Sequence, residues 1–277
     1  MPVILDKSAI LDKLHQLPAI PNVVQDVMAS FKDKNAGSAI LAHKIALDQG
    51  LSARVLRVAN SSFYGLAREV GSIQDAIMVL GFDTLRSLVI SAGFAHAFPT
   101  VADSLFDRHA YWTRSLRVAT YTEALAQCMG GARQLSFTAG LFHDVGQLVL
   151  SICIPEEFAA MLEQQKNSDS SLIEIEHAVL GFDHAEIGAE MARRWNFPAE
   201  IEHAIRYWRT PEKQPFMPIT GVVQMAVLIE SGLSGEALMK RIPETTRSQL
   251  QIGWEHIEPC IPQPEQMDAM VQVMLEA

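Results

Sequence analysis

The sequence predicts an all-α protein, and three observations indicate this fold class. Apolar residues recur at three- and four-residue spacing along most of the chain, as they do in amphipathic helices. No segment sustains the alternation with period two that is typical of a strand. Glycine and proline divide the helical pattern into short segments, with breaks at Gly50, Gly65, Gly81, Gly130, Gly131, Gly181, Pro198, Pro211 and Pro243.

One interruption predicts a division into two helical parts. Residues 98–103, which read Phe-Pro-Thr-Val-Ala-Asp, break the pattern, and a long helix is expected after them, from about Leu105 to Met129. We therefore expect an N-terminal helical part over residues 1–100 and a second part over residues 101–277, packed through a shared apolar interface. The helices after Thr245 are expected on the outside of the second part.

Two capping signals mark helix starts in the second part. Ser171 and Glu174 have the spacing of a capping box, and so do Asp183 and Glu186. Each pair precedes a stretch with helical spacing of apolar residues, so we expect one helix to begin at each of the two sites.

The most apolar window, residues 137–154, is predicted to be a buried helix that carries polar side chains. It contains the adjacent pair His143 and Asp144. Leu141 and Leu148 share its apolar face at helical spacing, and we expect both to lie in the core.

Composition and charge exclude several classes of protein. The 277 residues include 49% hydrophobic and 19% charged residues, which is typical of a globular protein. With 22 basic and 32 acidic side chains the formal charge is −10, which argues against binding to nucleic acid or to an anionic membrane and favours a protein partner. Asp6 and Lys7 stand where a secretory signal needs its apolar core, and charged or turn residues cut the longest apolar stretches, so we expect a cytoplasmic protein with no membrane span.

The cysteines predict no disulfide. There are three of them, Cys128, Cys153 and Cys260, an odd number at wide spacing, so neither a disulfide framework nor a cysteine zinc site is indicated. Cys128 and Cys153 lie in apolar helical stretches and are interpreted as buried, inert thiols.

The adjacent His143 and Asp144 are the candidate chemical site. A buried carboxylate is costly unless a metal ion, a cation or hydrogen bonds compensate its charge. Imidazole and carboxylate together suit a divalent transition metal, with further ligands arriving from other helices. The alternative interpretation is a structural, hydrogen-bonded pair at a helix bend near Gly146. The residues alone leave both interpretations open.

Several further motifs follow one another along residues 17–211. In the first part they are Leu17-Pro-Ala-Ile-Pro21, the stretch from Asp48 to Gly65 and the stretch from Gly71 to Gly81 with Leu85 and Arg86 behind it. In the second part they are Tyr111-Trp112-Thr-Arg114-Ser115, the stretch from Ala139 to Gly146, and the stretch from Gly181 to Gly188, which leads into Trp195-Asn-Phe-Pro198. In this order the motifs resemble the HDOD family, the signal-output relatives of HD-type metal-dependent phosphohydrolases. The resemblance implies an HD-like, phosphodiesterase-like helical fold preceded by a smaller N-terminal helical block.

The resemblance also implies a metal site, and this sequence departs from its ligand pattern. Where HD-type enzymes place a first histidine ligand, this chain has Arg114. Where relatives often have paired histidines, it has Trp208 and Arg209, and Val227 stands where a later aspartate is expected. The remaining candidate ligands are His143, Asp144 and His184.

A degenerate site is therefore predicted, with no cofactor beyond a weakly or adventitiously bound divalent metal held by those three residues. Arg114 suggests a replacement, because its guanidinium could neutralise Asp144 where the ion would sit. Two alternatives stay open for Arg114, namely this ion pair and an orientation toward solvent. His109 lies about 140° further round the same helix and should face elsewhere.

Histidines outside this group are given structural roles. His177 and His203 follow glutamate-rich turns of helix and are interpreted as solvated helix residues.

Two classes of function are weighed on this basis. The leading hypothesis is a non-enzymatic, cytoplasmic bacterial signal-transduction module that binds another signalling protein; the sequence does not name the partner or the oligomeric state. The competing hypothesis is a metal-dependent phosphohydrolase or phosphodiesterase that holds one ion through His143, Asp144 and His184 and binds phosphate through Arg114 or Arg209. A third hypothesis is a sensor that binds a nucleotide or another anion in the vacated cleft.

Overall fold

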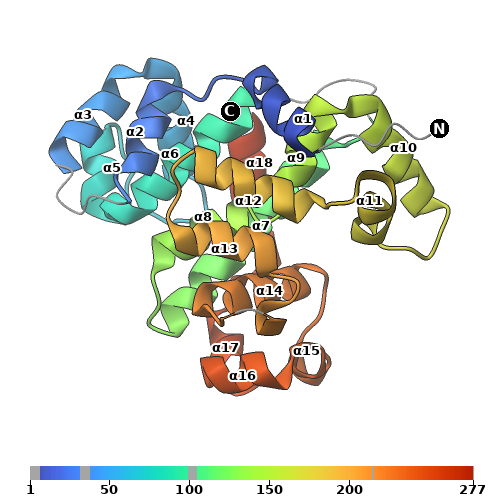
Figure 1. The fold of residues 1–277 in the computed structure, drawn as a ribbon. Helices are drawn as coiled ribbons and strands as arrows, with labels where there is room; N and C mark the ends of the chain where they lie inside the picture. Colours follow the sequence, from blue (N-terminus) through green and yellow to red (C-terminus); the bar gives the residue numbers. More distant parts are fainter. Residues whose placement is uncertain (1–6, 32–37, 99–104, 214, 277) are drawn as a thin grey trace.

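A computed structural model describes residues 7–31, 38–98, 105–213 and 215–276, and within these ranges every regular element is a helix, as predicted (Figure 1). The N-terminal part contains α1 (Lys7–Asp12), η1 (Lys13–Gln16), α2 (Asn22–Ala29), α3 (Ser38–Leu47), α4 (Gln49–Ala59), α5 (Ile73–Leu80) and α6 (Phe82–Ala97). The second part contains α7 (Arg108–Cys128), α8 (Arg133–Leu141), α9 (Val145–Cys153), α10 (Pro155–Lys166), α11 (Leu172–Leu180), α12 (His184–Arg194), α13 (Ala199–Tyr207), η2 (Pro211–Lys213) and α14 (Pro218–Glu230). It ends with α15 (Gly235–Arg241), α16 (Glu244–Leu250), α17 (Trp254–Ile257), η3 (Glu258–Cys260) and α18 (Pro264–Glu276).

Helix α7 is the centre of the second part. It packs on α8, α14 and α18, while α2 to α6 form a separate group on one side of the molecule and α10 and α11 lie on the other (Figure 1). The predicted interruption at residues 98–103 falls mostly outside the described residues. The long helix predicted after it corresponds to α7, which begins at Arg108 because the Asp107 side chain accepts a hydrogen bond from the backbone N–H of Ala110.

The two parts share one apolar core, and an aromatic group joins them. Phe94 of α6 lies edge-on to Phe142, with 4.6 Å between ring centroids, and its ring is 5.0 Å from that of Trp195. Phe142 in turn lies 5.2 Å from Phe197. Phe142 immediately precedes His143, so the packing of the N-terminal part reaches the candidate site directly.

The last helix crosses between the parts, which corrects one expectation. We expected the helices after Thr245 on the outside of the second part, and α18 does not follow this. It contacts α4, α6 and α7 and buries Met267, Met270, Val271 and Met274. The apolar spacing within α18 could not reveal its position between the two parts. The helices that α18 contacts are far from it in the sequence.

The apolar window at residues 137–154 is two helices rather than one. Helix α8 ends at Leu141, a turn covers residues 142–144, and α9 begins at Val145. The stretch Arg133–Cys153 has the length and apolar composition of a membrane span, and 83% of its most apolar window is buried inside the protein. It is the only such stretch among the described residues, and its burial is that of a core segment.

The prediction of no disulfide is wrong. Cys128, the last residue of α7, is bonded to Cys260 of η3, with 6.1 Å between their Cα atoms. The two cysteines are 132 residues apart in the chain, so their spacing carried no sign of the contact between α7 and η3 that brings them together. Cys128 is also exposed rather than buried, whereas Cys153 is a buried free thiol as predicted.

The predicted core positions Leu141 and Leu148 are confirmed, since both are buried. Replacing Leu141 with Ala should lower the free energy of unfolding by about 2 to 5 kcal/mol, because it removes methyl groups from a packed interior and leaves a cavity. Urea unfolding followed by circular dichroism measures the change. Leu47→Ala is the control, because the Leu47 side chain is 69% exposed and its loss should cost less than about 0.5 kcal/mol. Equal effects of the two substitutions would contradict the assignment.

Candidate functional site

His143 and Asp144 lie in the tight turn between α8 and α9, and both side chains are buried. The turn holds the His143 ring in place, because Nδ1 lies 2.7 Å from the carbonyl oxygen of Gly140 and donates its proton there. Trp208 Nε1 donates a hydrogen bond to the carbonyl oxygen of His143 over 3.1 Å. The other ring nitrogen, Nε2, faces Asp144 Oδ2 at 3.4 Å and has no hydrogen-bond partner.

A close crossing of two helices brings His184 to this turn. Gly146 of α9 lies against the backbone of α12, and a Cβ atom at Gly146 would come within 1.7 Å of the carbonyl oxygen of His184. Gly188 faces Gly146 from the other side of the same crossing. As a result His184 Nε2 lies 3.5 Å from Asp144 Oδ1. Any side chain at position 146 would force the two helices apart and separate these atoms.

Glu176 of α11 orients the His184 ring. Its Oε2 lies 2.7 Å from His184 Nδ1 and also accepts a hydrogen bond of 2.9 Å from the backbone N–H of His184. A carboxylate accepts only, so Nδ1 carries a proton and Nε2 is turned toward Asp144. This arrangement of carboxylate, imidazole and carboxylate fixes which nitrogen of His184 is available to the site.

Two arginines surround the Asp144 carboxylate. Arg209 Nη2 donates to Asp144 Oδ1 over 2.7 Å and lies 2.9 Å from His184 Nε2. Arg114 Nη1 donates to Asp144 Oδ2 over 3.2 Å, and its Nε contacts Glu230 Oε2 over 3.3 Å. Gln147 Nε2 adds a third donor to Asp144 Oδ2, at 3.2 Å. The two carboxylate oxygens of Asp144 therefore receive three side-chain hydrogen bonds, one on Oδ1 and two on Oδ2.

The Arg209 contact is the stronger of the two ion pairs. Its distance is shorter, its side chain is 27% exposed against 41% for Arg114, and its guanidinium stacks over the Trp208 ring at 4.0 Å. The predicted pairing of Arg114 with Asp144 is present in the structure, and an orientation of Arg114 toward solvent alone is not. Arg114 is the neutralising residue predicted from the sequence, but the geometry gives the main role to Arg209. Trp208 packs edge-on to His143, and this contact places the adjacent Arg209 beside Asp144.

The charges around the turn shift three pKa values. Burial opposes ionisation of Asp144, but the adjacent Arg209, with the two histidines, lowers its pKa well below the ordinary value. Burial lowers the pKa of His143 from 6.5 to about 4. For His184, burial is outweighed by hydrogen bonds to Asp144 and Glu176, which raise its pKa. Because Arg209 can only donate, its contact with His184 Nε2 is a hydrogen bond while the ring is neutral, and protonation of Nε2 would replace it with a hydrogen bond to Asp144.

The remaining residues singled out from the sequence lie away from the carboxylate. His109 is exposed, as expected. Val227 is buried in α14. His203 is half-buried rather than solvated, with Nδ1 at 3.0 Å from Thr220 Oγ1. His177 is exposed and lies 3.2 Å from Asp183 Oδ2.

Sequence reasoning missed Glu176 and Gln147. Glu176 is fully buried, although its sequence neighbours suggested a solvated helix face. Its position was the available signal, since it falls with Leu172, Ile175 and Leu180 on the apolar face of α11, where an unpaired carboxylate is not expected. Gln147 lies one turn after Asp144, and the available signal was its place as a polar residue within the apolar window at residues 137–154.

A cavity of about 200 Å³ opens beside the turn. Tyr111, Arg114, Asp144 and Gln147 contribute to its lining. The site as a whole is thus a buried carboxylate flanked by two imidazoles and two guanidiniums, next to a small cavity. Adjacent His and Asp between two buried helices, met by a second His from a later helix, define a helical domain of the HD type.

The family assignment is more specific. The family model of the HDOD domain matches residues 17–211, and the chain belongs to the HDOD family. The match covers both the N-terminal helical part and the turn that carries His143 and Asp144.

Solved structures of relatives have the same fold. A "Putative phosphohydrolase" from Shewanella amazonensis SB2B is 28% identical, with a TM-score of 0.78 over 96% of this chain and 98% of the relative. A "Putative signal transduction protein" from Marinobacter aquaeolei VT8 is 25% identical, with a TM-score of 0.78 over 99% of this chain and 67% of the relative.

A curated relative from Treponema pallidum (strain Nichols), named "Uncharacterized protein", is 24% identical over 252 residues, which are 90% of this chain and 48% of the relative. The chain thus spans about half the length of the curated relative it matches.

The depressed pKa of His143 predicts a loss of stability on mild acidification. In the unfolded chain this histidine takes up a proton near pH 6.5, whereas in the folded protein it stays neutral until about pH 4. The contribution of His143 to stability is therefore complete above about pH 6.5 and falls as the pH drops toward 4, by about 2 kcal/mol between pH 7 and pH 5. Urea unfolding at both pH values tests this. His143→Asn, which keeps a donor for Gly140, should remove most of this difference, and an unchanged pH dependence in that variant would refute the assignment.

The two arginines should differ in their contribution to stability. Arg209→Ala should cost about 3 to 5 kcal/mol, because it leaves the buried Asp144 charge short of its main partner. Arg114→Ala should cost about 1 kcal/mol, because that side chain is more exposed and Arg209 and Gln147 remain. Chemical unfolding of both variants measures the difference. A larger loss for Arg114→Ala than for Arg209→Ala would reverse the ranking drawn from the geometry.

Proposed function

We propose that this chain is a non-catalytic signal-transduction module with a degenerate HD metal site, which acts by binding another protein in the cytoplasm. The observation that carries the proposal is the Arg209 guanidinium. It lies 2.7 Å from Asp144 Oδ1 and 2.9 Å from His184 Nε2, two of the three atoms on which a metal ion would depend. An arginine stays protonated at any physiological pH, so the positive charge beside Asp144 persists throughout that range.

Electrostatics supports a loss of metal binding. Unit charges 4 Å apart near a protein surface interact by about 4 kcal/mol, so a divalent ion beside one guanidinium is repelled by roughly 8 kcal/mol before Arg114 is counted. Three protein ligands are the usual minimum for a catalytic zinc or iron site, and this site offers no more than His143, Asp144 and His184. The residues present therefore suit an internally neutralised carboxylate better than a metal centre.

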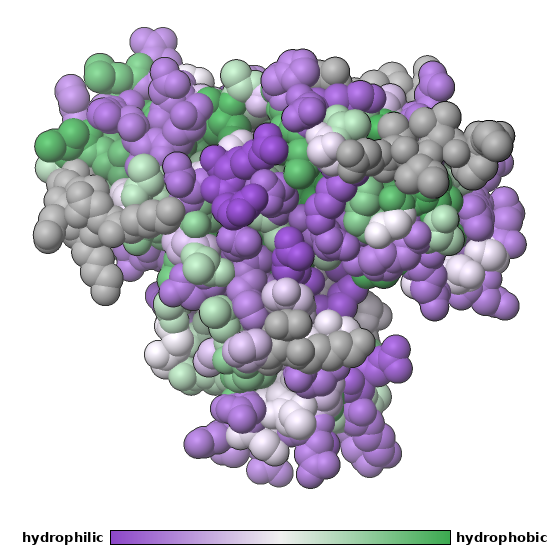
Figure 2. All heavy atoms as spheres, in the orientation of Figure 1, coloured by the Kyte–Doolittle hydropathy of each residue, from purple (hydrophilic) through white to green (hydrophobic). Residues whose placement is uncertain are grey.

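Three observations support action through a protein partner. The relative from Marinobacter aquaeolei VT8 is named for signal transduction, and the net charge of −10 disfavours nucleic acid as a partner. Large apolar side chains are also exposed on α3 and α5, which contact one another, at Ile40, Leu47, Met78 and Val79. Figure 2 shows apolar surface on this side of the molecule, over α3. Exposed apolar groups of this kind are a common feature of interaction surfaces.

Metal analysis and a turnover assay test the non-catalytic assignment. The purified protein, incubated with Mn²⁺ or Zn²⁺, should hold no ion through His143 and Asp144 and should not hydrolyse bis(p-nitrophenyl) phosphate. The competing phosphohydrolase predicts the reverse result. Stoichiometric metal that is lost in His143→Asn, together with turnover abolished by Asp144→Ala, would overturn the proposal. Capture of a partner protein from native lysate by the wild type would add support for output by binding.

A further inference from the structure

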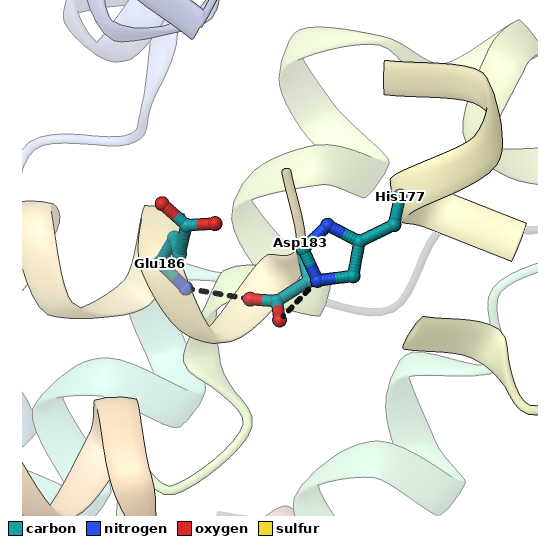
Figure 3. Close-up of side chains that lie close together, drawn as sticks. All are labelled: His177, Asp183 and Glu186. Atoms are coloured by element: carbon teal, nitrogen blue, oxygen red, sulfur yellow. Dashed lines mark hydrogen bonds and ion pairs between the residues drawn. The ribbon is translucent and has the colours of Figure 1, made fainter. Parts of the chain in front are cut away.

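A second group of metal-ligating side chains lies on the surface, at the junction of α11 and α12. His177 belongs to α11, Asp183 is the residue that caps the N-terminus of α12, and Glu186 lies in the first turn of α12. One ligand atom from each of the three lies within 4.8 Å of the others. Figure 3 shows the His177 ring in contact with the Asp183 carboxylate, at 3.2 Å between Nε2 and Oδ2.

The backbone holds this group in place. Gly181 ends α11 in a left-handed conformation, with φ of 81°, and reverses the chain into α12. Asp183 Oδ1 then accepts a hydrogen bond of 2.9 Å from the backbone N–H of Glu186, as the dashed line in Figure 3 shows. One carboxylate oxygen of Asp183 is thus used by the helix cap, and the other is directed at His177.

We propose that His177, Asp183 and Glu186 bind a divalent first-row transition metal ion, in competition with Lys7. One imidazole and two carboxylates are a ligand set that suits Zn²⁺ and Mn²⁺. The side chains are 47%, 14% and 30% exposed, so water can complete the coordination. Tetrahedral ligands about 2.1 Å from an ion lie about 3.4 Å apart, so the Glu186 side chain closes the site by a rotamer change of its flexible end.

Lys7 is the competitor. Its Nζ lies 2.5 Å from Glu186 Oε2 and also sits 5.9 Å from the centre of the Phe182 ring, so an ammonium now neutralises the carboxylate that the metal would need. A bound ion would take Glu186 from Lys7 and so remove a contact that attaches α1 to α12. The positive end of the α12 dipole lies at the same point and weakens the site for any cation, so we expect micromolar rather than tighter affinity.

The surface group and the Asp144 site are adjacent in the chain but consist of different residues. His177 follows Glu176 in α11, and Asp183 precedes His184 in the chain; Glu176 and His184 are buried, whereas His177 is exposed. A metal bound at the surface therefore leaves the proposed degenerate site unchanged. It follows that metal found on the purified protein has to be assigned to one site by substitution.

Isothermal titration of the full chain with MnCl2, and separately with ZnCl2, tests the proposal. We expect one saturable site whose affinity falls at least tenfold in His177→Gln and rises severalfold in Lys7→Met, because the latter removes the competing charge. His109→Gln is the matched control, since it removes an exposed histidine from another helix and should leave the affinity unchanged.

The outcomes separate this proposal from the proposed function. Absence of saturable binding, or equal binding by the wild type and His177→Gln, would overturn the surface site and leave the non-catalytic assignment intact. Binding that is lost in His143→Asn and kept in His177→Gln would place the ion at the Asp144 turn and overturn both. An affinity unchanged in Lys7→Met would overturn the competition with Lys7.

Discussion

The buried negative charge of Asp144 is the constraint on which the centre of this structure depends. A carboxylate in this position is tolerated only when cations or hydrogen bonds compensate it, and here Arg209, Arg114 and Gln147 all donate to it. Those donors come from the turn that follows α13, from α7 and from α9. These two ion pairs and one hydrogen bond therefore connect three separate segments of the chain around one turn.

Close packing makes this arrangement possible. Gly146 and Gly188 allow α9 and α12 to touch, and this contact brings His184 beside Asp144. Glu176 then fixes the His184 ring from the opposite side. On the other flank, Phe142 connects the turn to Phe94 of the N-terminal part. A change in the packing of the N-terminal helices that moves Phe94 would therefore alter its ring contact with Phe142, next to the turn.

The sequence predicted the fold class, the helix starts at Ser171 and Asp183 and the core positions of Leu141 and Leu148, because these depend on local capping and periodicity. It did not predict the break between α8 and α9, since the apolar pattern continues through the turn. The sequence also did not predict three further features, namely the Cys128–Cys260 bond, the burial of α18 and the leading role of Arg209. Each of these depends on residues far apart in the chain, and their proximity exists only in the packed structure.

The proposed replacement of a metal ion by arginine would change what the site can respond to. A bound ion exchanges with its surroundings, so the stability of a metal-dependent site varies with metal concentration. A guanidinium is part of the chain, and its charge varies neither with metal supply nor with physiological pH. The core of the proposed module is therefore expected to stay in one state while its surface carries the signal. Under this view a metal-responsive element belongs at the periphery, at a junction such as that of α11 and α12, where an exchangeable ion and an ammonium can compete for the same carboxylate.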